Sequence, residues 1–243
     1  LRDLAARILL LPVLSGQAIF VVLSITKRPE AAGPRSGPVG QGPRVRLLLL
    51  GDSSAAGVGA TTQDEALLGQ VLKPLSAHYT IDYELVAQTG ARTKDALGWM
   101  QARPPQTYDV VICALGGNDV TKGTSSRAFL QSQAELFDHL QSDRGAQVVV
   151  VSALPPVAQF PALPQPLRWV LGRQARSFDG QLRTLVEKRR GCVRFGFDLN
   201  LDVSAMASDG FHPGPAAYAA WGKAAAEIIH DQTLRLDGHA AAP

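Results

Sequence analysis

The chain has 243 residues, 46% of them hydrophobic and 19% charged. These proportions match an average soluble protein and disfavour disordered, collagen-like and multi-span membrane classes, and the length fits one large domain with or without an appendage. Twenty-four basic and 21 acidic residues give a net charge of +3, which is too small to indicate a nucleic-acid partner without a concentrated basic stripe. Cys113 and Cys192 lie far apart beside apolar stretches, so we expect buried thiols rather than a disulfide or a zinc site.

The N-terminal segment is uncharged over eighteen residues, from Ile8 to Ile25. A helix of this length, at about 1.5 Å per residue, approaches the ~30 Å hydrocarbon core of a bilayer. Residues 1–28 are therefore expected to form a membrane anchor through residues 8–25. A cleaved signal peptide with a small-residue site near Gly16 and Ala18 is the alternative. Both hypotheses predict a membrane-anchored or exported protein, at a bacterial inner membrane or in the periplasm.

Residues 29–43 are rich in Pro and Gly and are expected to be a linker to a domain over residues 44–243. Within that domain, strand and helix patterns alternate. The expected strands are 45–50, 80–87, 110–115, 147–153 and 192–197, and the expected helices are 65–78, 93–102, 125–142, 167–190 and 215–230. No hairpin signal separates adjacent strands, which indicates a three-layer α/β fold with a parallel sheet. Such sheets bind ligands at the carboxyl ends of their strands.

The first expected strand leads directly into a glycine-rich loop that contains Ser53. Glycines beside a serine at the end of a buried strand allow a sharp turn that holds the hydroxyl over the sheet, as in a nucleophile turn. A phosphate-binding loop requires Lys and then Ser or Thr after its second glycine, but Val58 follows Gly57. A dinucleotide-binding loop requires a third glycine where Thr62 stands. A plain tight turn is the remaining alternative for this loop.

Three further strand ends or loops carry candidate site residues. Asn118 follows the third strand and can donate a side-chain N–H to an oxyanion. Gly90 follows the second strand and allows close approach of a backbone N–H. Asp209 precedes His212 by three residues, a spacing at which the carboxylate can fix the tautomer that a general base requires. Each pattern alone is more typical of a turn or a helix cap, but together they lie where this architecture places its site.

In chain order, four blocks resemble the motifs of the SGNH/GDSL hydrolases, and the resemblance covers roughly residues 44–230. The blocks are Leu50-Gly51-Asp52-Ser53-Ser54, Gly90, Gly116-Gly117-Asn118-Asp119 and Asp209-Gly210-Phe211-His212-Pro213. The resemblance implies a flavodoxin-like, five-stranded parallel sheet of order 2-1-3-4-5. It also implies ester or thioester hydrolysis without a metal or cofactor, and the bacterial thioesterase/lysophospholipase-like branch is the most similar.

By position, the resemblance implies Ser53 as nucleophile, His212 as base and Asp209 as its orienting acid. The Ser53 and Gly90 amides and the Asn118 side chain would form the oxyanion hole. Ser54 stands where leucine is usual in the first block, a position that is not catalytic in the family. A carbohydrate deacetylase, an acyltransferase and an inactive binding module on the same fold are alternatives.

The loop over residues 154–166 carries five prolines and several apolar side chains. Because it leaves the carboxyl edge of the sheet, Phe160 and Leu163 are candidates for a lip over an acyl pocket. Packing of these side chains onto the following helix is the alternative. The expected partners are a small ester or lipid-like substrate and the membrane, with no nucleic acid.

Overall fold

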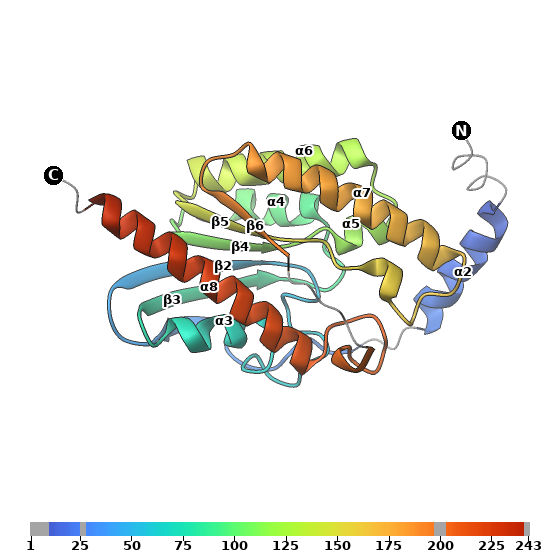
Figure 1. Cartoon of the computed structure of the whole chain (residues 1–243), viewed down its shortest axis with the longest axis horizontal. Helices are drawn as coiled ribbons and strands as arrows, with labels where there is room; N and C mark the ends of the chain where they lie inside the picture. Colours follow the sequence, from blue (N-terminus) through green and yellow to red (C-terminus); the bar gives the residue numbers. More distant parts are fainter. Residues whose placement is uncertain (1–9, 25–27, 197–202, 241–243) are drawn as a thin grey trace.

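The structure, a computed structural model, describes residues 10–24, 28–196 and 203–240 of the chain. At its centre is a six-stranded sheet of order β1-β3-β2-β4-β5-β6 (Figure 1). The strands are β1 (Ser36–Val39), β2 (Arg44–Gly51), β3 (Thr80–Ala87), β4 (Val110–Ala114), β5 (Val148–Ser152) and β6 (Cys192–Phe195). Neighbouring strands run parallel except β1 and β3. The sheet is thus mostly parallel, with six strands rather than the expected five.

The additional strand, β1, lies inside the segment that was expected to be a linker. Ser36 pairs with Glu84 of β3 and Val39 pairs with Ile81, so residues 36–39 form the antiparallel edge of the sheet. Pro38 is compatible with this position because an edge strand has one side without a pairing partner. A segment rich in Pro and Gly can thus form a short edge strand as well as a linker. The sheet begins before Arg44, inside the expected linker.

Helices cover both faces of the sheet and make three layers (Figure 1). One face packs against α4 (Thr93–Ala102), α5 (Gly117–Thr121), α6 (Ser126–Ser142) and α7 (Leu167–Glu187), and the other against α3 (Leu67–Leu75) and α8 (Pro215–Ala240). In β2, Leu48 and Leu50 pack in the first core and Leu47 and Leu49 in the second. This two-sided burial explains the unbroken apolar run of the strand.

The N-terminal helix α2 (Leu11–Ser24) has 14 residues and a length of about 21 Å at 1.5 Å per residue. The amide nitrogen of Gln17 donates to the Gln165 carbonyl at 2.6 Å, and its oxygen accepts from the Leu167 N–H at 3.0 Å. Among the described residues, no helix is both long and apolar enough to cross a membrane. The remaining parts of the expected anchor, residues 1–9 and 25–27, lie outside the described residues. Large apolar side chains of α2 are exposed: Leu11, Val13, Ile19, Phe20 and Leu23.

Both cysteines are free thiols. Cys113 is buried in β4 and Cys192 is half-buried in β6. Burial raises the pKa of the Cys113 thiol well above its ordinary value, and it raises the pKa of Cys192 to about 11. Neither thiol is therefore set up to react as a thiolate at neutral pH.

Candidate active site

The loop that presents Ser53 begins at Gly51, the last residue of β2. A Cβ on Gly51 would lie 2.7 Å from the Ala114 carbonyl oxygen and would overlap Ala55, so this close approach to β4 requires glycine. The turn is then closed by a hydrogen bond from the Ala56 N–H to the Asp52 carbonyl at 2.9 Å. The loop holds Ser53 buried at the carboxyl end of the central strand.

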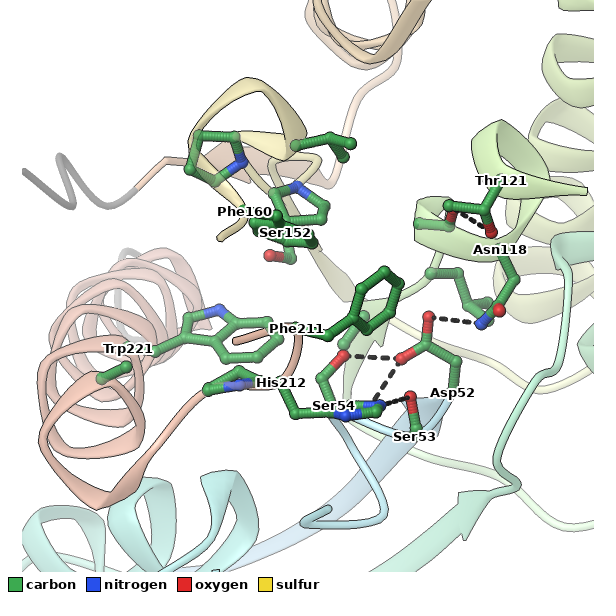
Figure 2. A pocket seen from close by; sticks show the side chains of 18 of the residues that line it. Asp52, Ser53, Ser54, Asn118, Thr121, Ser152, Phe160, Phe211, His212 and Trp221 are labelled. Carbon is green, nitrogen blue, oxygen red and sulfur yellow. Dashed lines mark hydrogen bonds between the residues drawn. The ribbon is translucent and has the colours of Figure 1, made fainter. Parts of the chain in front are cut away.

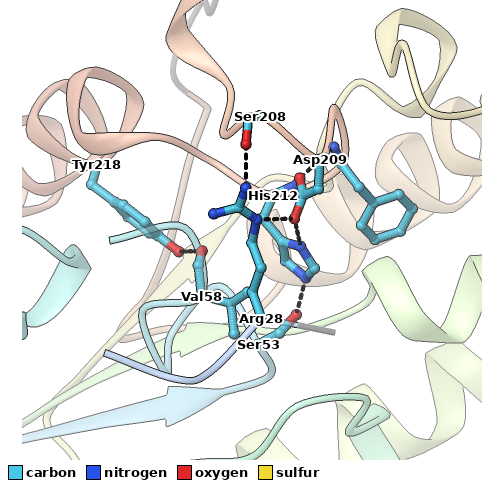
Figure 3. Close-up of polar contacts among 8 residues, drawn as sticks. Arg28, Ser53, Val58, Ser208, Asp209, His212 and Tyr218 are labelled. Atoms are coloured by element: carbon cyan, nitrogen blue, oxygen red, sulfur yellow. Dashed lines mark hydrogen bonds and ion pairs between the residues drawn. The ribbon is translucent and has the colours of Figure 1, made fainter. Parts of the chain in front are cut away.

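Ser53, His212 and Asp209 form one continuous line of hydrogen bonds (Figure 3). Ser53 Oγ lies 3.1 Å from His212 Nε2, and His212 Nδ1 lies 2.9 Å from Asp209 Oδ2. A neutral histidine that donates from Nδ1 to the carboxylate leaves Nε2 to accept the hydroxyl proton. The structure thus brings together the three residues for which the sequence resemblance implies catalytic roles.

The Asp209 carboxylate is fixed by the backbone as well as by His212. Its Oδ1 accepts from the Phe211 N–H at 2.9 Å and from the His212 N–H at 3.0 Å. Burial alone would raise the pKa of Asp209, but the hydrogen bonds from His212 and Phe211 outweigh it and lower the pKa to about 2. The carboxylate therefore stays ionised over the neutral and mildly acidic range, where it can stabilise an imidazolium.

Asn118 reaches the same site from the short helix α5. Gly116 precedes this helix with φ +116°, and a Cβ there would lie 3.1 Å from Leu154, so the sharp entry requires glycine. Asn118 Nδ2 donates to Asp52 Oδ2 at 3.1 Å (Figure 2). An amide nitrogen carries two hydrogens, so the second N–H is left for the pocket that Asn118 and Ser53 both line.

Asp52 is the fully buried carboxyl that orients this amide. Its Oδ1 accepts from the Ser54 N–H at 3.0 Å and from Ser54 Oγ at 2.6 Å. Burial raises the pKa of Asp52 above its ordinary value, although the bonds from Ser54 and Asn118 oppose that effect. Asp52 thus connects the loop after β2 to the helix after β4. Within the described ranges, no group of three or more His, Cys, Asp or Glu side chains is placed to hold a metal ion.

Gly90 does not line the described pocket that contains Ser53 and Asn118. It has φ +84°, a left-handed conformation that favours glycine, and its carbonyl accepts from Lys122 Nζ at 2.5 Å. The contribution of its N–H to an oxyanion hole stays a prediction.

The pocket beside Ser53 has mostly apolar walls (Figure 2). Phe160 lines it and packs edge-on against Phe211, with 5.2 Å between the ring centroids. Leu163 is buried in the core and does not line the pocket, so of the two residues expected to form a lip only Phe160 lies at the pocket. The lip itself stays a prediction. The other lining residues from the same loop are Pro155, Pro156 and Val157.

Two residues near the hydrogen-bonded line were not predicted from the sequence (Figure 3). Arg28 Nε lies 3.4 Å from Asp209 Oδ2. The Tyr218 hydroxyl donates to the Val58 carbonyl at 2.7 Å and thereby joins α8 to the loop of Ser53. Tyr218 occupies one position of an ordinary helical repeat, and Arg28 flanks an apolar run far from Asp209 in the chain. Neither position carries a local pattern that would identify it.

The sequence model of the GDSL-like lipase/acylhydrolase family matches residues 49–220 of the chain. The chain belongs to this family. The matched range includes Ser53, Asn118, Asp209 and His212. The resemblance found in the sequence is therefore confirmed.

Relatives and solved structures agree with this GDSL-family assignment. The chain is 30% identical over 188 residues to a GDSL-like esterase of Mycobacterium tuberculosis, a match that covers 72% of the chain and 58% of the relative's length. The psychrotrophic esterase EstA from Pseudoalteromonas superposes with a TM-score of 0.56 at 19% identity, covering 79% of this chain and 98% of EstA. A carbohydrate esterase of family 3 from Talaromyces cellulolyticus superposes with a TM-score of 0.57 at 14% identity, covering 77% of this chain and 97% of that esterase. These two structures show a shared fold.

Proposed function

We propose that this GDSL-family protein is a serine hydrolase that cleaves carboxylic esters or thioesters through an acyl-enzyme. The line of hydrogen bonds from Ser53 through His212 to Asp209, beside an apolar pocket, is the observation that carries the proposal. Ser53 Oγ attacks the acyl carbonyl while His212 Nε2 takes its proton. His212 then returns that proton to the leaving alkoxide or thiolate. Water then attacks the acyl-enzyme while His212 Nε2 takes its proton, and His212 returns that proton to Ser53 Oγ as the bond to the acyl carbon breaks and the carboxylic acid leaves.

Negative charge develops on the carbonyl oxygen during both steps. We assign its stabilisation to the N–H groups of Ser53 and Gly90 and to the side chain of Asn118. Asp52 supports this assignment because it fixes the Asn118 amide before substrate binds, and a donor that is already oriented needs no reorganisation in the transition state.

Turnover of p-nitrophenyl esters tests the proposed reaction. We expect the purified protein to hydrolyse them at a rate that EDTA leaves unchanged, and one equivalent of a fluorophosphonate should stop it. The Pseudoalteromonas esterase structure contains a phosphonate-inhibited enzyme, which supports this choice of probe. A rate that falls in EDTA and returns with a divalent ion would contradict the serine mechanism.

Asn118→Ala is expected to lower kcat about 10²- to 10³-fold with little change in KM, because the lost donor acts on charge that exists only in the transition state. Steady-state kinetics on p-nitrophenyl acetate measure both constants. An effect confined to KM would show that Asn118 binds substrate uniformly and would remove it from the oxyanion hole.

Phe160→Ala is expected to change the preference for acyl length. If the acyl chain lies against Phe160, each buried methylene gains up to about 0.8 kcal/mol, so kcat/KM should rise up to about fourfold per carbon from acetate toward medium chains. The variant should flatten this rise and leave acetate hydrolysis nearly unchanged. Equal losses on acetate and octanoate would mean that Phe160 supports the fold, and an acetate optimum in the parent protein would favour a deacetylase.

We further propose that residues 8–25 attach the protein to a membrane or direct its export. The uncharged run and the exposed apolar side chains of α2 support this. The full-length protein should then sediment with membranes and require detergent for release. Recovery of a mature protein that begins just after Ala18 would indicate a cleaved signal instead, and a full-length protein that stays in the supernatant would contradict both.

A further inference from the structure

The chain between α2 and β1 contacts three loops of the candidate active site. We propose that residues 28–32 form a strap in which Arg28 is a positioning residue for Asp209 and His212. This role rests on the serine-hydrolase function proposed above.

Arg28 contacts the acid end of the hydrogen-bonded line directly (Figure 3). Its Nε lies 3.4 Å from Asp209 Oδ2, the same oxygen that accepts from His212 Nδ1, and its Nη2 donates to Ser208 Oγ. The Asp209 side chain is only 1% exposed, whereas that of Arg28 is 34% exposed. The guanidinium thus covers the buried carboxylate from the solvent side and binds two consecutive residues of the loop that carries His212.

The next residues of the strap bind the other two loops. Glu30 Oε1 accepts from both the N–H and the hydroxyl of Thr89, each at 2.8 Å, and Thr89 immediately precedes Gly90 in the chain. Ala31 donates its N–H to the Ala56 carbonyl at 3.1 Å, in the loop of Ser53. The loops of the nucleophile, of Gly90 and of His212 therefore share one short partner segment.

Arg28 is expected to act on the reaction through the orientation of Asp209. Asp209 Oδ2 holds His212 Nδ1 at 2.9 Å, so a carboxylate that is free to turn would leave His212 less often aligned with Ser53. Proton transfer belongs to the chemical step, so loss of Arg28 should reduce kcat and leave KM nearly unchanged.

The test compares Arg28→Met, Arg28→Gln and Arg28→Lys with the full-length parent on p-nitrophenyl acetate. The two neutral variants should lower kcat about tenfold with KM within twofold. Arg28→Lys keeps the positive charge beside Asp209 and should recover part of kcat. Arg44→Met is the matched control, because Arg44 forms an exposed ion pair with Asp82 at 3.7 Å, and it should change neither quantity.

The role of Arg28 would be overturned if both neutral variants kept the kcat of the parent. It would equally be overturned if they lost kcat and thermal stability together and Arg28→Lys recovered neither, since that result describes a purely structural contact. Labelling of the parent by a fluorophosphonate separates the two proposals, because a failure there contradicts the serine mechanism whatever the Arg28 variants show.

Discussion

Replacing Ser53 by alanine is expected to lower kcat on p-nitrophenyl esters by about 10⁴-fold or more, because the atom that bonds to the acyl carbon is removed. The neighbouring hydroxyl offers a matched control. Ser54 Oγ donates to Asp52 Oδ1 at 2.6 Å. Ser54→Ala should therefore change kcat by less than about tenfold, because the Asp52 carboxyl group loses one of its hydrogen bonds. Steady-state kinetics on both variants make the comparison. A Ser53→Ala protein that keeps a tenth of the parent activity would assign the nucleophile elsewhere.

Replacing Asp209 by asparagine is expected to lower kcat by about 10⁴-fold with KM little changed, the size of effect seen when the corresponding acid of a serine-protease triad is replaced. The asparagine amide would donate to His212 Nδ1 and place the imidazole proton on Nε2. That nitrogen faces Ser53 at 3.1 Å and could then no longer accept its proton.

Asp143→Asn is the control for the Asp209 substitution. Asp143 also pairs with a histidine, since its Oδ2 lies 2.5 Å from His139 Nδ1, but this pair is on the surface. Asp143→Asn should leave kcat unchanged. Comparable losses in the two variants would mean that the Asp209 effect is a general consequence of losing an Asp–His pair.

The elements that were predicted well are those whose sequence pattern is set by local burial. The helix expected over residues 93–102 has those bounds in the structure, and the apolar run of β2 reflects a strand covered on both faces. Short elements were missed. β1 has four residues of a composition shared with linkers, and α5 has five, fewer than two helical turns. β1 is stabilised by pairing with β3, which is remote in the sequence, and α5 begins at the tight turn of Gly116.

The candidate site divides in the same way. Ser53, Asn118 and the Asp209–His212 pair could be predicted because each follows a strand or precedes a helix, and the carboxyl ends of parallel strands share one edge. Arg28 could not be predicted, because its contact with Asp209 depends on the path of the N-terminal segment across the folded domain. The sequence also could not show that Phe160 lines the pocket and Leu163 does not, because two apolar residues of one loop give no indication of which one faces the pocket.

The most direct test of the proposed serine mechanism is to identify the residue that a fluorophosphonate modifies. After inactivation of the full-length protein, peptide mass spectrometry should find one adduct, on Ser53, at close to one equivalent per chain. The same treatment of Ser53→Ala should give none. An adduct on Ser54 or on another residue, or a protein that hydrolyses esters without forming an adduct, would contradict the proposed serine mechanism.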